Sequence, residues 1–261
     1  MRLKIALEVA DFRGADWVPI NYQYVLASAL YKIIEKGDSE YSKWLHDTGI
    51  KDGTKTFKFF TFSRLVPQKY QVNKDQLVFL SPYAECIISF YTGSHAGPFI
   101  NGLFRDTVLE LGDRNSRIKF RVLRVEMIEN IDFKEEMRFQ CLSPIVISYR
   151  NQGQKYPEYL KPDSPGFSEL FLKNLQQKYQ AYNGSTSLPE IEKSAAHYYF
   201  RLEGEYKRKG VTIKEGRPGE SRIIGYDFRF AVHLPLELMQ IGYYAGFGEK
   251  NSMGFGCVRE W

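Results

Sequence analysis

Two side chains able to exchange protons fall on the polar sides of two helices predicted near the N-terminus. Tyr31 comes late in a helix expected over about 21–35, roughly 150° from the centre of its apolar stripe. His46 lies in the last turn of a short helix expected over about 39–47, beside Asp47. There the helix dipole and the neighbouring carboxylate favour the imidazolium, which suits proton transfer near neutral pH. Both residues are therefore candidates for acid–base chemistry, against the commoner case of a surface side chain without a chemical role.

A glycine-rich segment near the C-terminus is the most specific pattern in the chain. Two glycine pairs flank the five residues from Glu249 to Met253, between an expected helix and an expected strand. Glycines permit positive φ and let backbone N–H groups approach a phosphate or another chain closely. A dinucleotide-binding fingerprint is excluded, because Asn251 stands where that motif needs glycine. The candidate residues are Gly246, Gly248, Gly254 and Gly256, and a tight loop packed on its own sheet is the equal alternative.

The elements expected in the first half follow a βαββαβ order. Apolar residues alternate from Met1 to Val9, which predicts a half-buried strand. Asn21 can cap the first helix, which ends near Gly37. Further along we expect extended segments at about 56–66, 76–81 and 84–92, a helix at about 96–110 and a strand at 117–128.

The second half repeats that order. We expect a strand at about 137–149, a helix at about 165–182, a hairpin of strands at 197–208 and 222–234, a helix at about 235–244 and a last strand from Phe255. The sequence therefore predicts an α+β fold of two tandem ferredoxin-like domains, over 1–130 and 131–261, with the glycine-rich loop near the C-terminus. No repeat is visible in the sequence, so the duplication rests on element order.

Composition excludes several classes of protein. At 43% apolar residues the chain can bury a core, and no segment reaches the roughly 18 uncharged apolar residues of a membrane helix. The N-terminal segment carries charges and lacks a small-residue cleavage site, so we expect no signal peptide and a cytoplasmic protein. The three cysteines and four histidines are scattered, which argues against a disulfide framework and against a metal site.

Positive charge is concentrated in two segments, although the net charge is only +5. Residues 114–124 hold five basic side chains and no acidic one. In the strand expected there, Arg117, Lys119 and Arg121 share one face, which could track a nucleic-acid backbone or simply be solvated. Residues 207–222 hold six basic side chains, expected around the hairpin tip: Lys207, Arg208, Lys209, Lys214, Arg217 and Arg222.

The glycine-rich segment also carries a family resemblance. Gly246–Gly256, GFGEKNSMGFG, resembles the glycine-rich loop of the RAMP superfamily, whose domains are RRM-like. Leu142–Val146, LSPIV, opens the second half, and Asn21–Tyr24, NYQY, opens the first helix. With these segments the whole chain most resembles the CRISPR repeat-processing endoribonucleases, the sixth Cas family.

The resemblance implies an active site of tyrosine, histidine and lysine that uses no metal and no cofactor. Tyr31 and His46 match the first two, and Lys58 matches the lysine, with Lys51 and Lys55 as alternatives in the same loop. In such a site the ribose 2′-hydroxyl attacks the phosphate, leaving a 2′,3′-cyclic phosphate and a 5′-hydroxyl. His46 would transfer a proton, as the acid, Tyr31 would be base or positioner, and Lys58 would face the phosphate; which of Tyr31 and His46 is the base stays open.

The implied partner is CRISPR repeat RNA, and CRISPR effector subunits or a second copy of the chain in a homodimer are further candidates. The residues expected to contact RNA are Arg117, Lys119, Arg121, Lys207, Arg208, Arg222, Gly246, Gly248, Gly254 and Gly256. One rival interpretation is a RAMP subunit that binds repeat RNA without cutting it, which would not need Tyr31, His46 and Lys58 together. Another is a duplicated ferredoxin-like protein that acts on a small ligand and has no affinity for RNA.

Overall fold

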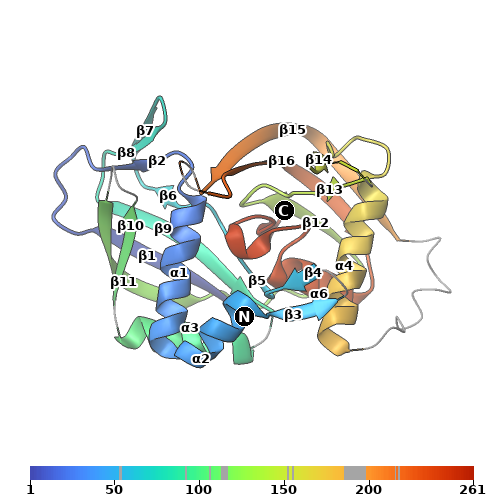
Figure 1. Cartoon of the computed structure of the whole chain (residues 1–261), viewed down its shortest axis with the longest axis horizontal. Helices are drawn as coiled ribbons and strands as arrows, with labels where there is room; N and C mark the ends of the chain where they lie inside the picture. The colour runs from blue at the N-terminus through green and yellow to red at the C-terminus, as the bar shows by residue number, and fades with distance from the viewer. Residues whose placement is uncertain are drawn as a thin grey trace.

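The computed structural model places two sheets side by side, each with helices packed on it (Figure 1). It describes residues 1–52, 55–91, 93–105, 107–112, 117–151, 153–154, 156–184, 198–214, 216 and 218–261. Within these ranges the side chains of residues 46, 51–52, 93–96 and 104 lie outside the description. None of the helices so described is long and apolar enough to cross a membrane.

The first half is built on a six-stranded antiparallel sheet in the order β10-β11-β1-β9-β5, with β6 also paired to β9. Its elements are β1 (Arg2–Val9), β2 (Trp17–Pro19), α1 (Gln23–Gly37), α2 (Ser39–Asp47), β3 (Ile50–Asp52), β4 (Lys55–Phe57), β5 (Phe60–Phe62), β6 (Val66–Pro67), β7 (Tyr70–Asn73), β8 (Gln76–Phe79), β9 (Tyr83–Phe90), α3 (Gly93–Arg105), β10 (Val108–Gly112) and β11 (Arg117–Met127).

Burial of the apolar side chains of β1 against α1 fixes the position of α1. The alternation in β1 turns Leu3, Ile5 and Leu7 into a core that also contains the apolar stripe of α1. On another side, α1 approaches α3 so closely that a Cβ at Gly102 would lie 1.8 Å from the carbonyl oxygen of Ile33. A third side of α1, with Tyr24, Ser28 and Tyr31, faces the second half.

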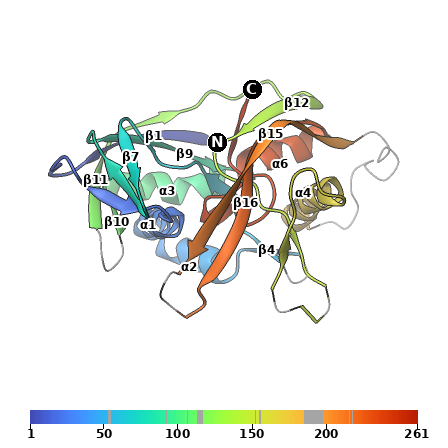
Figure 2. The ribbon, with the colours of Figure 1, turned by 90° about the horizontal axis from the view of Figure 1, so that it is seen from above.

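The second half is built on a four-stranded sheet in the order β15-β16-β12-β17. Its elements are β12 (Glu136–Cys141), β13 (Ser148–Tyr149), β14 (Glu158–Tyr159), α4 (Phe167–Asn183), β15 (Tyr199–Ile213), β16 (Ser221–His233), α6 (Leu236–Ala245), the 3₁₀ helix η2 (Asn251–Met253) and β17 (Val258–Glu260). Seen from above, β1 and β12 lie toward one side of the molecule and α1 and α2 toward the other (Figure 2).

The two sheets share one strand order. In each half, four strands and two helices follow the βαββαβ order along the chain: β1, α1, β5, β9, α3 and β11, then β12, α4, β15, β16, α6 and β17. Across the sheet these strands read fourth, first, third, second in both halves, as β11-β1-β9-β5 and β17-β12-β16-β15. The α+β fold predicted from the sequence is therefore confirmed.

Several predicted element boundaries are wrong. The helix expected over 96–110 ends at Arg105, because Leu109 and Leu111 gain burial in a strand that pairs with the free side of β11. The strand expected over 137–149 ends at Cys141, shortly before Pro144, which has no N–H to donate. Asn21 does not cap α1; its Oδ1 accepts a hydrogen bond from the backbone N–H of Thr212 at 3.4 Å.

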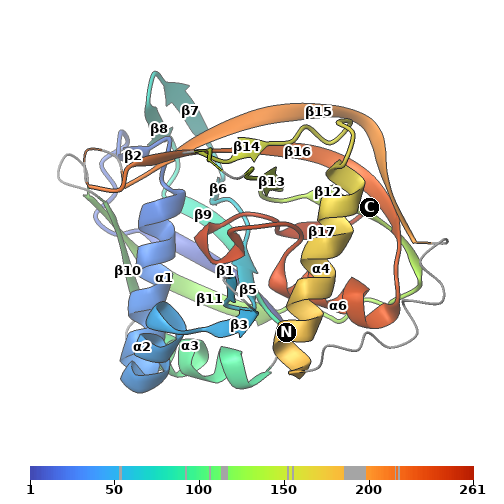
Figure 3. The same ribbon diagram turned by 45° about the vertical axis from the view of Figure 1, so that its right-hand side comes forward.

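The halves are joined by polar contacts as well as by apolar packing. The guanidinium of Arg2 in β1 is buried, donates to the carbonyl of Val258 at 2.6 Å and stacks over the ring of Tyr243. Arg64 of the first half forms an ion pair with Asp227 of β16. The long hairpin of β15 and β16 arches over the molecule to the start of α1 (Figure 3), where Thr212 meets Asn21.

Candidate active site

A cleft of 1010 Å³ lies between the two halves. Residues of α1 line one side and residues of α4 the other, with β4 and β13 contributing as well. The Gly-rich loop, residues 246–256, runs between the two helices (Figure 3). The cleft therefore collects side chains from segments that are far apart in the sequence.

Close packing explains the glycines of the Gly-rich loop. All four of its predicted glycines are buried and have positive φ. At Gly256, where φ is 78°, a Cβ would lie 2.0 Å from the carbonyl oxygen of Phe247. The loop thus packs on itself and on both halves, and its more exposed residues are the five from Glu249 to Met253. An RNA contact by the glycines stays a prediction.

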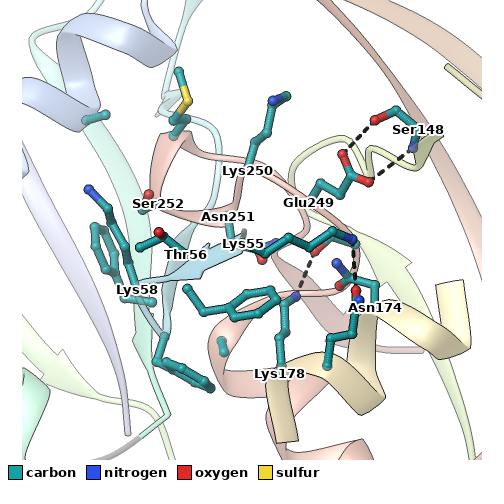
Figure 4. A pocket seen from close by; sticks show the side chains of 18 of the residues that line it. Lys55, Thr56, Lys58, Ser148, Asn174, Lys178, Glu249, Lys250, Asn251 and Ser252 are labelled. Atoms are coloured by element: carbon teal, nitrogen blue, oxygen red, sulfur yellow. Dashed lines mark hydrogen bonds between the residues drawn. The ribbon is translucent and has the colours of Figure 1, made fainter. Parts of the chain in front are cut away.

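A buried lysine of α4 binds the Gly-rich loop through two hydrogen bonds. Lys178 of α4 is 2% exposed, and its Nζ donates to the carbonyl oxygens of Gly246 at 2.6 Å and Gly248 at 2.7 Å (Figure 4). Burial lowers the pKa of Lys178 to about 7, the charge of Glu249 opposes the shift and Lys55 adds to it. Two loop carbonyls thereby gain a donor that the loop itself does not supply.

Further hydrogen bonds close the loop and attach it to the first half. Asn251 Nδ2 donates to the carbonyls of Phe247 at 3.1 Å and Phe255 at 3.0 Å. Thr61 of β5 donates its hydroxyl to the carbonyl of Phe255 at 2.8 Å. Side chains from α4, from β5 and from the loop itself therefore fix the same short segment.

Tyr31 meets the Gly-rich loop at the first-half wall of the cleft. Its ring packs edge-on against Phe60, with the centroids 5.6 Å apart. Its hydroxyl oxygen is shielded from solvent. Burial raises the pKa of Tyr31 to about 12, and a hydrogen bond with Ser252 opposes the rise. The hydroxyl therefore stays protonated at neutral pH.

Lys58 lies against Tyr31 because the chain passes here from the hydrophobic core of the second half to that of the first. Phe57 and Phe59 pack into the core of the second half, whereas Phe60 packs into that of the first. Between them, Lys58 places its Nζ 5.1 Å from the centre of the Tyr31 ring. Burial lowers the pKa of Lys58 below its ordinary value, and the carboxylate of Asp47 opposes the shift.

Of the other predicted catalytic residues, the structure describes the side chain of Lys55 but not those of His46 and Lys51. His46 is in the last turn of α2, but its side chain and that of Lys51 lie outside the described residues. Asp47, the next residue, is near enough to act on the charge of Lys58, so this turn lies close to the Tyr31–Lys58 pair. Lys55 also lines the cleft and donates to Gln177 Oε1 of α4 at 2.8 Å.

The cleft is strongly basic. Among the described residues that line it are seven basic side chains, Lys55, Lys58, Arg150, Lys173, Lys178, Lys214 and Lys250. The single carboxylate among them, Glu249, accepts hydrogen bonds from the N–H and the hydroxyl of Ser148. A cleft of one charge sign concentrates oppositely charged ligands, so this one suits a polyanion.

Comparison with known proteins identifies the family. A family model described as CRISPR associated protein Cas6, C-terminal, matches residues 127–260, and another, CRISPR-associated protein Cas6, N-terminal, matches residues 17–126. The chain belongs to the Cas6 family.

Individual relatives match this chain over nearly its whole length. The chain is 30% identical to CRISPR-associated endoribonuclease Cas6 1 of Methanocaldococcus jannaschii, over 99% of this chain and 92% of the relative. A solved structure of a CRISPR associated protein Cas6 is 28% identical with a TM-score of 0.75, over 100% of this chain and 99% of that one. A RAMP protein described as binding different RNA substrates shares the fold at 22% identity, with a TM-score of 0.81 and the same coverage.

The basic strand face predicted in this Cas6 family member lies away from the cleft. Arg117, Lys119 and Arg121 are exposed on the face of the first sheet opposite α1. Arg117 pairs with Glu110 of β10 at 2.8 Å, and Arg121 with Glu8 of β1 at 3.2 Å. This face carries mixed charge, and RNA binding there stays a prediction.

The predicted position of the basic hairpin tip is wrong. The β-branched residues Val211, Thr212 and Ile213 continue β15, so the turn begins at Lys214. Lys207 and Arg208 therefore sit within β15, opposite Asp227 and Tyr226 of β16. Arg222 lies in β16 opposite Thr212, and Arg217 is outside the described residues.

The pH dependence of stability tests the role of Lys178. Its pKa is about 7 in the folded protein against 10.5 ordinarily, so the unfolded chain binds more protons between these values. The free energy of unfolding should therefore rise with pH from about 7 to about 10. In Lys178→Met this rise should be flatter. Urea unfolding at several pH values measures the free energy of unfolding of both proteins. If it changed with pH equally in both, the pKa of Lys178 would not be lowered in the folded protein.

Proposed function

We propose that this protein cuts CRISPR precursor RNA within each repeat, without a metal, at the cleft between its halves. That the chain is an endoribonuclease follows from its family, because its relatives in Methanocaldococcus jannaschii and Pyrococcus furiosus are named CRISPR-associated endoribonucleases. The observation that carries the proposal is the placement of Tyr31 and Lys58 side by side, next to the turn that holds His46, in a basic cleft. The catalytic residues then belong to the first of two domains, residues 1–130, and the loop to the second, 131–261.

The chemistry needs only groups available in the cleft and on the RNA. The ribose 2′-hydroxyl supplies the nucleophile, and its attack on the adjacent phosphate releases a 5′-hydroxyl and leaves a 2′,3′-cyclic phosphate. His46 protonates the leaving oxygen, a role typically worth about 10²–10⁴ in rate. The proton of the 2′-hydroxyl passes to solvent, which then reprotonates His46. Lys58 stabilises the charge that builds on the phosphate oxygens.

Tyr31 is a positioning residue in this scheme. A hydroxyl with its pKa raised to about 12 is a weak base at neutral pH, and its oxygen is shielded. Its hydroxyl instead holds Ser252 of the Gly-rich loop, and its ring holds the cation of Lys58. The alternative role of Tyr31 as base is therefore the weaker one.

The basic cleft is the proposed path of the RNA backbone. Lys55 of β4 and Lys173 of α4 line the cleft, and Lys250 of the Gly-rich loop lines it as well. The β11 face is the alternative path, but its arginines already have carboxylate partners. Product handed on to CRISPR effector subunits would leave from this same cleft.

Cleavage should proceed in excess EDTA, because none of the proposed groups acts through a metal. A repeat RNA with deoxyribose just 5′ of the scissile phosphate should bind but resist cutting, since the nucleophile is missing. Single-turnover assays on both substrates measure this. Loss of activity in EDTA with rescue by Mg²⁺, or normal cutting of the deoxy substrate, would contradict the mechanism.

Substitutions separate cutting from binding. In His46→Ala, single-turnover cleavage should fall about 10²-fold or more, with little change in affinity for uncleavable RNA. Lys58→Ala should lose about 10²–10³-fold, and Tyr31→Phe, which loses one hydrogen bond, on the order of tenfold. His233→Ala, outside the cleft lining, is the matched control and should cut normally. Full activity in the three cleft variants would favour a binding subunit whose cleavage site, if any, lies elsewhere.

The salt dependence of affinity distinguishes the two RNA paths. Replacing Lys55, Lys173 and Lys250 together by alanine should flatten the plot of log affinity against log salt by about 2, for three lost contacts with single-stranded phosphates. The triple alanine variant of Arg117, Lys119 and Arg121 should keep nearly the wild-type slope. The reverse result would move the RNA to the β11 face.

A further inference from the structure

An amide side chain is buried in the wall of the cleft without a hydrogen-bond partner for its oxygen. Asn174 of α4 lines the cleft and is 3% exposed. Its Oδ1 is shielded from solvent and accepts no hydrogen bond from any residue that the structure describes. An unpaired buried acceptor destabilises a fold, and native proteins contain few such atoms. At the wall of a cleft, such an acceptor is suited to a ligand that donates a hydrogen bond.

The polar neighbours of Asn174 on α4 bind other groups. Lys178, one turn later, donates to two carbonyls of the Gly-rich loop. Gln177, three residues later and therefore beside Asn174 on the helix surface, accepts from Lys55 Nζ at 2.8 Å (Figure 4). Lys55 belongs to the proposed path of the RNA backbone, so a nucleotide whose phosphate binds Lys55 lies within reach of Asn174.

Only some groups of RNA can donate a hydrogen bond to Asn174 Oδ1. Phosphate oxygens accept and do not donate at neutral pH, so they suit the lysines of the cleft. The donors of RNA are the N–H groups of its bases and the ribose 2′-hydroxyl. A side-chain amide presents an acceptor beside a donor, and this pair matches the amino group and the adjacent ring nitrogen of adenine. Cytosine presents the same pair of groups, so a base fits the amide better than a single hydroxyl does.

We propose that Asn174 reads one base of the bound RNA, an adenine or a cytosine. Its Oδ1 accepts from the amino group of the base, and its Nδ2 donates to the adjacent ring nitrogen. The amide turns toward the base by rotation about χ2, a torsion that is broad in asparagine. Asn174 thereby contributes to affinity for the repeat sequence and takes no part in the cleavage step. This inference rests on the proposed function in one respect, the binding of repeat RNA in the cleft.

Base analogues test the contact in the full chain. In repeat RNA made uncleavable by deoxyribose at the cleavage position, each adenosine or cytidine is replaced in turn by the analogue that lacks the amino group. At one position at least, the replacement should weaken binding to the wild-type chain about tenfold. It should leave binding to Asn174→Leu nearly unchanged, because that variant has no amide to lose a bond. Asn183→Leu, the same substitution on α4 but outside the cleft lining, is the control and should show the full loss.

Thermal stability distinguishes base reading from a role of Asn174 in the fold. Asn174→Leu replaces an unpaired acceptor by an apolar group of similar size, so it should melt at or above the wild-type temperature. Asn174→Ala should lose the same base discrimination as the leucine variant. If the leucine variant melted far below the wild-type chain, the amide would be bonded within the fold and the proposal would be wrong. It would also be wrong if either variant kept every loss that the wild-type chain shows with the analogues.

A deoxyribose scan of the same RNA separates a base contact from a sugar contact. Variants of Asn174 that become insensitive to deoxyribose at one position, and to no base analogue, would place the 2′-hydroxyl on the amide and contradict base reading. A wild-type chain that cuts the repeat, with variants that discriminate among the analogues as it does, would overturn this inference alone. A wild-type chain that does not bind repeat RNA would overturn the proposed function as well.

Discussion

The arrangement of the cleft depends on pairing the buried carbonyls of the Gly-rich loop. A segment that enters the protein interior without a strand or helix to satisfy it must find donors elsewhere. Lys178 supplies them to Gly246 and Gly248 from α4, and Thr61 supplies one to Phe255 from β5. Because these donors come from both halves, the loop fixes the two walls of the cleft relative to each other.

That constraint also shapes the electrostatics of the site. The hydroxyl of Tyr31 is buried beside the fixed loop, burial raises its pKa, and the cation of Lys58 lies over the Tyr31 ring. Burial lowers the pKa of Lys58, so this cation is less completely hydrated than a surface lysine. A poorly hydrated cation in a basic cleft interacts strongly with a phosphate that replaces the missing water.

The elements predicted correctly from the sequence are those whose apolar residues repeat with the period of a strand or a helix. The alternation of β1, the apolar stripe of α1 and the βαββαβ order of each half follow from burial on one face. Residues 108–110 were wrongly assigned to a helix, because their pairing with the distant strand β11 outweighed the helical pattern. The cleft cations Arg150 and Lys173 were missed because only the fold brings their segments together. One feature of the sequence could have revealed Lys178: it lies at helical spacing on the same face of α4 as the buried Phe171 and Leu175.

The most direct test of the cleft as active site is a crystal structure of the protein with repeat RNA that carries deoxyribose at the cleavage position. The scissile phosphate should lie at the Tyr31 wall of the cleft, about 3 Å from Lys58 Nζ, with the His46 imidazole toward the leaving oxygen. A scissile phosphate on the outer face of β11, or at the turn between β15 and β16, would contradict it.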